Sequence, residues 1–149
     1  MTHHKLFRLL AVGWMTLIFF LSSQTLLQAP ALFSGSDLFA HLACYAVLGV
    51  FLARSQAPPG VMSWKRVILL VVLVTVYGAT DEYHQSFVPG RDASGRDLLA
   101  DGLGGFIAAW MLFWWDRRTV NNSQPVAPDR EKHIPSAQAQ RLAIGEDRG

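Results

Sequence analysis

Long apolar runs alternate with short polar segments along most of the chain. The stretches without Asp, Glu, Lys or Arg cover residues 9–36, 38–53, 67–80 and 102–115. A helix that spans a bilayer needs about 20 mainly apolar residues, within a range of about 17–25. The first run is long enough alone, and the others reach that length with flanking polar residues that face the bundle interior or extend to the membrane surface. The pattern predicts an all-α fold, a four-helix transmembrane bundle with spans at about 6–27, 38–54, 62–80 and 97–115.

The pattern changes after residue 118, where Pro, Gln, Ser and Asp become frequent and large apolar side chains become rare. Such a segment cannot bury enough apolar surface to offset the entropy that it loses on ordering. We therefore predict two parts, a transmembrane domain over residues 1–118 and a disordered polar tail over residues 119–149.

The first apolar run has a second interpretation, a cleaved signal peptide, because the basic residues Lys5 and Arg8 precede it. Two features argue against cleavage. The apolar stretch continues to about Leu27, beyond the usual length of a signal peptide, and Pro30 would directly follow the candidate cleavage site. These features favour a span that is retained.

The distribution of basic residues predicts the orientation in the membrane. Most of them lie near the first residues, in the middle connection and after the fourth span, at Lys5, Arg8, Arg54, Lys65, Arg66, Arg117 and Arg118. The first connection has no Lys or Arg, and the third has only Arg91 and Arg96. Because positive residues favour the cytoplasmic side, we expect both termini and the tail inside and the third connection outside.

Composition supports the membrane assignment and excludes some chemistry. Hydrophobic residues make up 51% of the chain and charged residues only 16%, against about 25% charged in ordinary soluble domains. The single cysteine, Cys44, provides neither an internal disulfide nor a cysteine-based metal or redox pair. Nucleic acid is not expected as a partner, because no basic stripe with interleaved aromatics lies outside the spans.

Ionisable residues gather in one segment of this charge-poor chain. The stretch "TDEYHQSFVPGRDASGRDLLAD", residues 80–101, holds five acids, two arginines and a histidine. Asp37 and His41 are four residues apart at the start of the second span, as are Asp97 and Asp101 at the start of the fourth, so each pair shares one helix face. The end of the third span adds Asp81, Glu82, His84 and Gln85. We expect three helix ends to bring these side chains to one membrane face.

Helix capping is a structural alternative for two of these acids. Ser34 and Ser94 each stand three residues before an aspartate, which resembles a capping box with Asp37 or Asp97 in the acidic position. Capping does not extend to His41 and Asp101, which lie beyond the first turn. An ionised aspartate facing lipid there would cost up to about 2.5–3.5 kcal/mol, so a buried partner or a function explains the deeper residues better. For the residues between the spans, an ordinary solvated loop is the alternative.

The residue types allow several kinds of site. We assign His41, Glu82, Asp97 and Asp101 as candidate catalytic residues, and Asp37, Gln85 and Arg91 as candidate ligand-binding residues. Arg91 follows a Pro-Gly turn and would hold a phosphate or carboxylate, while His41 would act as acid or base. A divalent metal is possible, but no cofactor is identified because no standard metal-binding spacing is present. A serine nucleophile at Ser86 or Ser94 also stays open, without a nucleophile elbow to support it.

Three motifs together resemble the VanZ-like family of small bacterial membrane proteins. They are "DLFAHLACYAVLG" at residues 37–49, "DEYHQSFVPGR" at 81–91 and "DLLADGLGG" at 97–105. The chain has Leu38 where the family usually has Lys, and Asp101 where it usually has Asn. The resemblance implies a multi-pass protein of the bacterial cytoplasmic (inner) membrane and cell envelope. The namesake of the family is associated with low-level resistance to the glycopeptide antibiotic teicoplanin.

The polar residues and the resemblance lead to one main functional hypothesis. The outward cluster would bind or process a lipid-linked or peptidoglycan-type intermediate that carries phosphate or carboxylate groups. Whether the protein is an enzyme is left open, as is its oligomeric state. The main rival is a non-catalytic membrane factor that acts through a protein partner, with the cluster as a structural clasp between helices. Transport of a small solute ranks last, because four short spans form a pathway only in an oligomer.

Overall fold

The computed structural model describes residues 2–24, 35–56 and 62–122, which form four helices and no strand. The helices are α1 (His3–Ser22), α2 (Ser36–Gln56), α3 (Trp64–Gln85) and α4 (Gly95–Asn122). All four are long and apolar enough to cross a membrane. The predicted all-α, four-helix membrane fold is therefore confirmed. Ser34 and residues 123–149 of the expected tail lie outside the described residues.

Several helices end at places that differ from the predicted spans. Helix α3 continues to Gln85 rather than residue 80, and α4 continues to Asn122, past the expected boundary at residue 118. Helix α1 ends earlier, at Ser22. There the hydroxyls of Ser22 and Ser23 donate hydrogen bonds to the carbonyl of Phe19, at 3.0 and 2.6 Å, and so compete with continuation of the helix.

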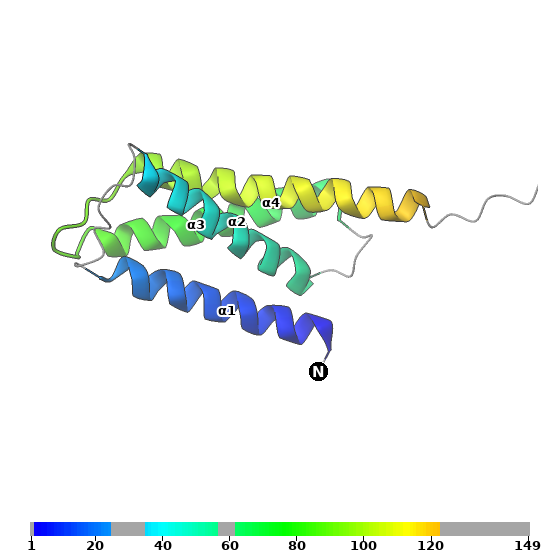
Figure 1. Ribbon diagram of the computed structural model, residues 1–149, viewed down its shortest axis with the longest axis horizontal. Coiled ribbons are helices and arrows are strands. Elements are labelled where there is room, and N and C mark those ends of the chain that lie inside the picture. The colour runs from blue at the N-terminus through cyan, green and yellow to red at the C-terminus, as the bar shows by residue number, and fades with distance from the viewer. Residues whose placement is uncertain (1, 25–34, 57–61, 123–149) are drawn as a thin grey trace, which may run out of the picture.

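Helices α2 and α4 form the closest pair in the bundle, with α2 running obliquely between α4 and α1 (Figure 1). Glycines make this approach possible. A Cβ atom on Gly104 would collide with the carbonyl oxygen of Leu42 and lie 2.9 Å from the backbone nitrogen of Ala46, and a Cβ on Gly49 would lie 2.9 Å from the Cβ of Ala108. Small residues at helix interfaces are the usual means by which membrane helices approach closely.

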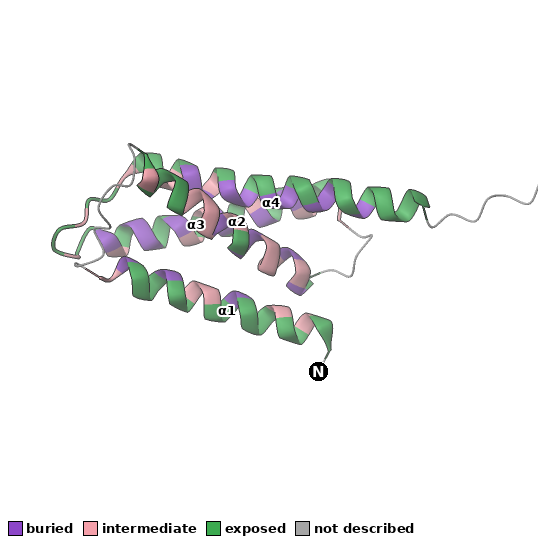
Figure 2. Cartoon of the chain, viewed as in Figure 1, coloured by how far each residue is buried: buried purple, intermediate pink, exposed green. Residues whose placement is uncertain are grey.

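Helix α1 is the least covered of the four helices, as the predominance of exposed residues along it shows (Figure 2). Its buried residues are Ala11, Ile18 and Ser22. One side-chain hydrogen bond attaches it to α2 and another attaches it to α3. The indole Nε1 of Trp14 donates to the carbonyl of Cys44 at 2.9 Å, and the hydroxyl of Tyr77 donates to the carbonyl of Met15 at 2.6 Å.

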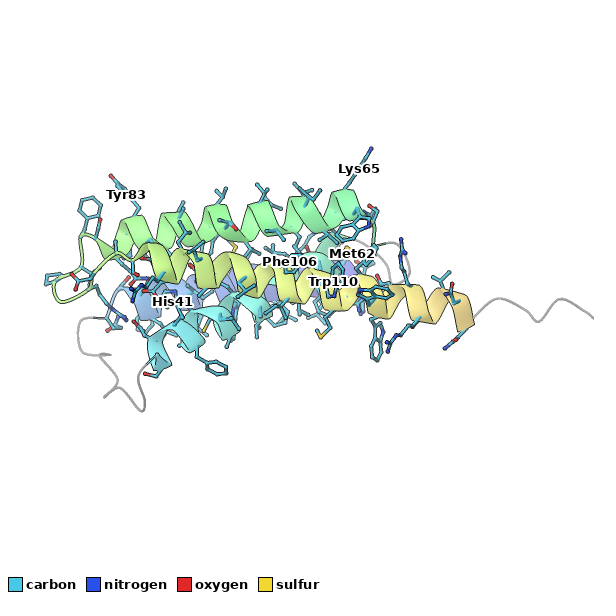
Figure 3. The ribbon with its side chains drawn as sticks, turned by 90° about the horizontal axis from the view of Figure 1, so that it is seen from above. His41, Met62, Lys65, Tyr83, Phe106 and Trp110 are labelled. Carbon is cyan, nitrogen blue, oxygen red and sulfur yellow. The ribbon has the colours of Figure 1, made fainter. Side chains whose placement is uncertain are left out.

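Replacing Tyr77 by phenylalanine should loosen α1 without disturbing the other three helices. The change removes the bond to the Met15 carbonyl, which corresponds to about 0.5–1.5 kcal/mol. Thermal unfolding of the detergent-solubilised chain should show a lower midpoint for Tyr77→Phe. Tyr83→Phe is the matched control, because Tyr83 is exposed and projects away from the bundle (Figure 3). Equal midpoints for the two variants would contradict the expectation.

The beginning of α1 and the end of α4 lie at the same end of the bundle (Figure 1). This end has its own ion pair, in which Arg54 donates to the buried carboxylate of Asp116 at 3.3 Å. Arg117 lies over the ring of Phe113, 4.3 Å from its centre. The opposite end, where α3 finishes and α2 and α4 begin, carries the acids and the histidine that were predicted to meet at one membrane face.

Candidate functional site

The end of α3 and the beginnings of α2 and α4 bring their polar side chains together. His41 comes from α2, Glu82 and Gln85 from α3, and Asp97 and Asp101 from α4. In Figure 3, His41 lies at this end of the bundle, close to the connection between α3 and α4. We call this group, together with Asp81, the polar cluster.

The last turns of α3 supply the acids because the helix continues beyond its apolar run. Asp81, Glu82 and Gln85 are all buried, whereas Tyr83 between them is exposed. Positions i, i+1 and i+4 lie close together on one face of a helix, so these three face the bundle while Tyr83 faces outward (Figure 3). The interpretation of this segment as an ordinary solvated loop is therefore wrong for Asp81, Glu82 and Gln85.

His41 and Asp101 form the most direct contact between α2 and α4 in the cluster. The Nδ1 atom of His41 lies 3.0 Å from Oδ1 of Asp101, whose side chain is 0% exposed. Asp101 fits there because Gly78 of α3 stands opposite, where a Cβ would come within 2.6 Å of Oδ2. That second oxygen has no hydrogen-bond partner among the described residues.

Glu82 connects α3 both to His41 and to the start of α4. Its Oε2 atom accepts a hydrogen bond from the backbone N–H of Ser94 at 2.6 Å. Its Oε1 atom lies 3.9 Å from Nδ1 of His41 and accepts from Nε2 of Gln85 at 3.5 Å. One carboxylate thus fixes the α3–α4 connection and also faces the histidine.

Asp81 also belongs to the cluster, although it was not among the predicted site residues. Its Oδ2 atom accepts hydrogen bonds from the hydroxyl of Tyr45 at 3.2 Å and from Nε2 of Gln85 at 3.0 Å, while Oδ1 has no partner among the described residues. The i, i+4 spacing of Asp81 and Gln85 was the sequence feature that could have identified Asp81 as part of the site. Tyr45 is buried with its hydroxyl satisfied, and its ring stacks beside His41.

The capping interpretation holds only in part at the start of α4. The hydroxyl of Ser94 accepts from the backbone N–H of Arg96 at 3.2 Å, as an N-cap does. In a capping box, Asp97 would accept in return from the N–H of Ser94, but Glu82 takes that hydrogen. The half-buried Asp97 instead has a carboxylate oxygen within 4.8 Å of ligand atoms of His41 and Glu82. Within the described part of the chain, these three residues form a group that could hold a metal ion.

A cavity of about 240 Å³ lies beside the cluster, between α1, α2 and α3. Its polar lining residues are Ser22, Asp37, His41, Tyr45, Asp81, Gln85 and Arg91. Asp37 is exposed at this cavity, in contrast to the deeper His41 on the same face of α2. Arg91 donates from one terminal nitrogen to the carbonyl of Leu21 at 3.2 Å. Its Nε atom is buried without a partner in the described part of the chain.

The serines considered as nucleophiles are engaged elsewhere. Ser86 donates its hydroxyl hydrogen to the carbonyl of Tyr83 at 2.7 Å, and the hydroxyl of Ser94 serves as the cap of α4. Neither makes a hydrogen bond to His41 among the residues that the structure describes. The geometry therefore gives no support to a Ser-His-Asp arrangement. His84 lies apart from the cluster, 2.9 Å from the hydroxyl of Ser23.

A model of the family described as VanZ/LLP1 matches residues 7–116. The match includes nearly all of the four-helix bundle and every residue of the polar cluster. Comparison with curated proteins and with solved structures finds no match.

Proposed function

The chain belongs to the VanZ/LLP1 family, and from this membership and the site geometry we propose that it binds the head group of a lipid-linked or peptidoglycan-type component of the bacterial cell envelope. The head group enters the cavity beside the polar cluster. The protein resides in the cytoplasmic membrane, with the cavity on the outer side, as the distribution of Lys and Arg favours.

Arg91 is the observation that carries this proposal. Its guanidinium lines the cavity, uses one nitrogen on the carbonyl of Leu21 and keeps a buried Nε–H without a partner in the described residues. Buried N–H donors are almost always paired in folded proteins. Phosphate and carboxylate groups are the preferred partners of a guanidinium, because its donors match their oxygens in pairs.

The acids in the cavity limit which anions fit. Ionised carboxylates are acceptors only, so Asp37 and Asp81 attract hydroxyl or ammonium groups and repel a second phosphate. A head group that combines one phosphate with sugar or amine groups offers an anion to Arg91 and hydrogen-bond donors to the two carboxylates. The phosphate contacts Arg91 and the hydrogen-bond donors contact Asp37, Asp81 and the carbonyl of Gln85. This combination is the reason to favour a lipid-linked sugar over a simple inorganic anion.

The apolar part of the lining fits the remainder of such a molecule. Ile18, Leu21, Ala40 and Cys44 are the apolar lining residues. The volume of about 240 Å³ is below the roughly 300–1,000 Å³ of pockets that enclose whole drug-sized ligands. The cavity therefore receives only part of the head group, and the lipid tail stays in the bilayer.

A catalytic version of this function would use His41 as acid or base with Asp101 holding its ring, at 3.0 Å. Glu82 and Asp97 are the other candidates beside the ring. A different observation favours the rival function, a structural clasp in a non-catalytic membrane factor. Glu82 fixes the backbone of Ser94 at 2.6 Å, and such a bond holds helices together whether or not a ligand binds.

Replacing Arg91 by glutamine should weaken binding of a phosphorylated lipid. The variant loses the charged donors, and hydrogen bonds to charged groups contribute about 1.5–3 kcal/mol, which corresponds to at least about a tenfold loss of affinity. The measurement is native mass spectrometry of the purified chain titrated with a polyprenyl phosphate. The corresponding polyprenol, which lacks the phosphate, is the ligand control.

Arg96→Gln is the matched protein control, because Arg96 lies at the same end of the bundle but is exposed and outside the cavity lining. It should bind the polyprenyl phosphate as the unmodified chain does. Equal binding of the phosphate and the polyprenol by the unmodified chain would refute the proposal. So would equal affinities of Arg91→Gln and Arg96→Gln.

A role in teicoplanin resistance is the cellular side of the proposal. It is supported by the family membership and by the envelope chemistry of the proposed ligand. Expression of the chain in a teicoplanin-susceptible bacterium should raise the inhibitory concentration, and Arg91→Gln should abolish the increase at equal folded yield. A lower folded yield of Arg91→Gln together with the lost increase would instead favour the clasp.

A further inference from the structure

We propose that His41, Glu82 and Asp97 bind a divalent transition-metal ion such as Zn²⁺ or Mn²⁺. Each residue comes from a different helix and offers a ligand atom, and the three atoms lie within 4.8 Å of one another. One imidazole nitrogen and two carboxylate oxygens form a mixed donor set that first-row transition ions accept readily. The proposal rests on this geometry and not on the identity of any lipid.

Small side-chain movements would bring the three atoms to bonding distance. Ligand atoms about 2.1 Å from a tetrahedral ion stand about 3.4 Å apart. The three atoms here lie within 4.8 Å of one another, so the distance between the farthest two has to shorten by at most about 1.4 Å. Asp97 is half-buried near the start of α4 and is not held by the capping bond to Ser94. Rotation of its carboxylate would change its distances to the other two ligand atoms without a shift of the helices.

Asp101 fixes the ring of His41 by accepting from Nδ1, which leaves Nε2 as the nitrogen free to bind a metal. When Nδ1 donates its hydrogen to Oδ1 of Asp101, across 3.0 Å, the lone pair of the neutral ring is on Nε2. A carboxylate behind a ligating histidine is the usual support for metal binding, because it fixes the ring and raises its basicity. Asp101 is 0% exposed and keeps Oδ2 unpartnered, so its negative charge acts on the histidine without screening by solvent.

The charge of the cluster also calls for a cation. Asp81, Glu82, Asp97 and Asp101 gather around one histidine, and the ion pairs that the described residues make at this end all involve His41. Carboxylates removed from water are stable only when paired or coordinated. A divalent ion would neutralise two of these charges. With three protein ligands it would keep an open position, which could take a phosphate oxygen if the proposed function holds.

The test is metal binding by the full chain in detergent, without any added lipid. After treatment with a chelator, Zn²⁺ and Mn²⁺ are titrated by calorimetry, with Mg²⁺ for comparison. The adjacent His3 and His4 are a competing binding site, so all variants carry His3→Gln and His4→Gln. We expect saturable binding of about one Zn²⁺ or Mn²⁺ per chain and a higher melting temperature with the metal.

Two substitutions separate the proposed ligands from the other acids. Asp97→Asn should weaken metal binding at least about tenfold, because it replaces a negatively charged carboxylate ligand by a neutral amide. Asp92→Asn, the same chemical change at an exposed residue of the α3–α4 connection, should bind like the parent. No saturable binding by the parent would overturn the proposal, as would equal affinities of the two variants. Lipid binding through Arg91 is measured separately, so either proposal can fail alone.

Discussion

Replacing Gly104 by alanine should destabilise the bundle by about 3 kcal/mol, or prevent folding altogether. Overpacking of a close interface costs about 1–3 kcal/mol and sometimes more. At Gly104 the added methyl group meets the backbone of α2, at the carbonyl of Leu42 and the nitrogen of Ala46. Backbone atoms cannot rotate away as a side chain does, so α2 and α4 have to separate along their closest contact.

Gly13→Ala is the matched control for this prediction. Gly13 lies inside α1, and a Cβ atom there has nothing within 4 Å. The change should be neutral or stabilising by up to about 1 kcal/mol, because alanine favours a helix more than glycine does. Thermal unfolding and the yield of monodisperse protein in detergent measure both variants. Similar midpoints and yields would show that the α2–α4 contact is not as close as described.

Asp101→Ala is the substitution in the polar cluster with the largest expected effect, a loss of about 3 kcal/mol. Removing one partner of a buried charged pair leaves the other without compensation, at a typical cost of about 3–5 kcal/mol. Here the histidine is half-buried, so the lower end applies. Asp101→Asn removes the charge but keeps an oxygen of the same shape facing Nδ1 of His41, so the hydrogen bond remains and the loss should be clearly smaller than for alanine.

Denaturation of the two Asp101 variants in detergent separates the interpretations. A large loss for alanine and a small one for asparagine would show that the acceptor at 3.0 Å from His41 is what stabilises this end. Equal losses would mean that the negative charge itself is required. Equal stability of both variants and the parent would show that the contact contributes nothing to the fold.

The fold was predictable from the runs without charge. A segment that crosses the bilayer has to make its backbone hydrogen bonds internally and present apolar side chains to the lipid, and helices of that length and composition do both. The ends of the helices were less predictable. Hydropathy falls at the first ionisable residue, yet α3 continues through Asp81, Glu82 and Gln85. These side chains stay in the helix because groups on α2 and on the α3–α4 connection form hydrogen bonds with the two carboxylates. Such partners cannot be identified from hydropathy.

Helical spacing predicted part of the candidate site. It placed His41 and Asp101 deeper than the residues that precede them by four, and they make the central contact of the cluster. It did not distinguish Asp37, which is exposed at the cavity, from the half-buried Asp97, because that difference depends on how each helix begins. The bond of Arg91 to Leu21 depends on the path of the α3–α4 connection, which spacing does not describe.

Helix α1 forms one wall of the cavity through Ile18, Leu21 and Ser22. It is also the helix with the smallest covered face, since 17% of its apolar stretch is buried, against 44% for α4. The easiest separation within the bundle is therefore a lateral one, along a seam between α1 and its neighbours that faces the acyl chains. An amphiphile using that seam would reach Arg91 sideways, with its tail never leaving the hydrocarbon.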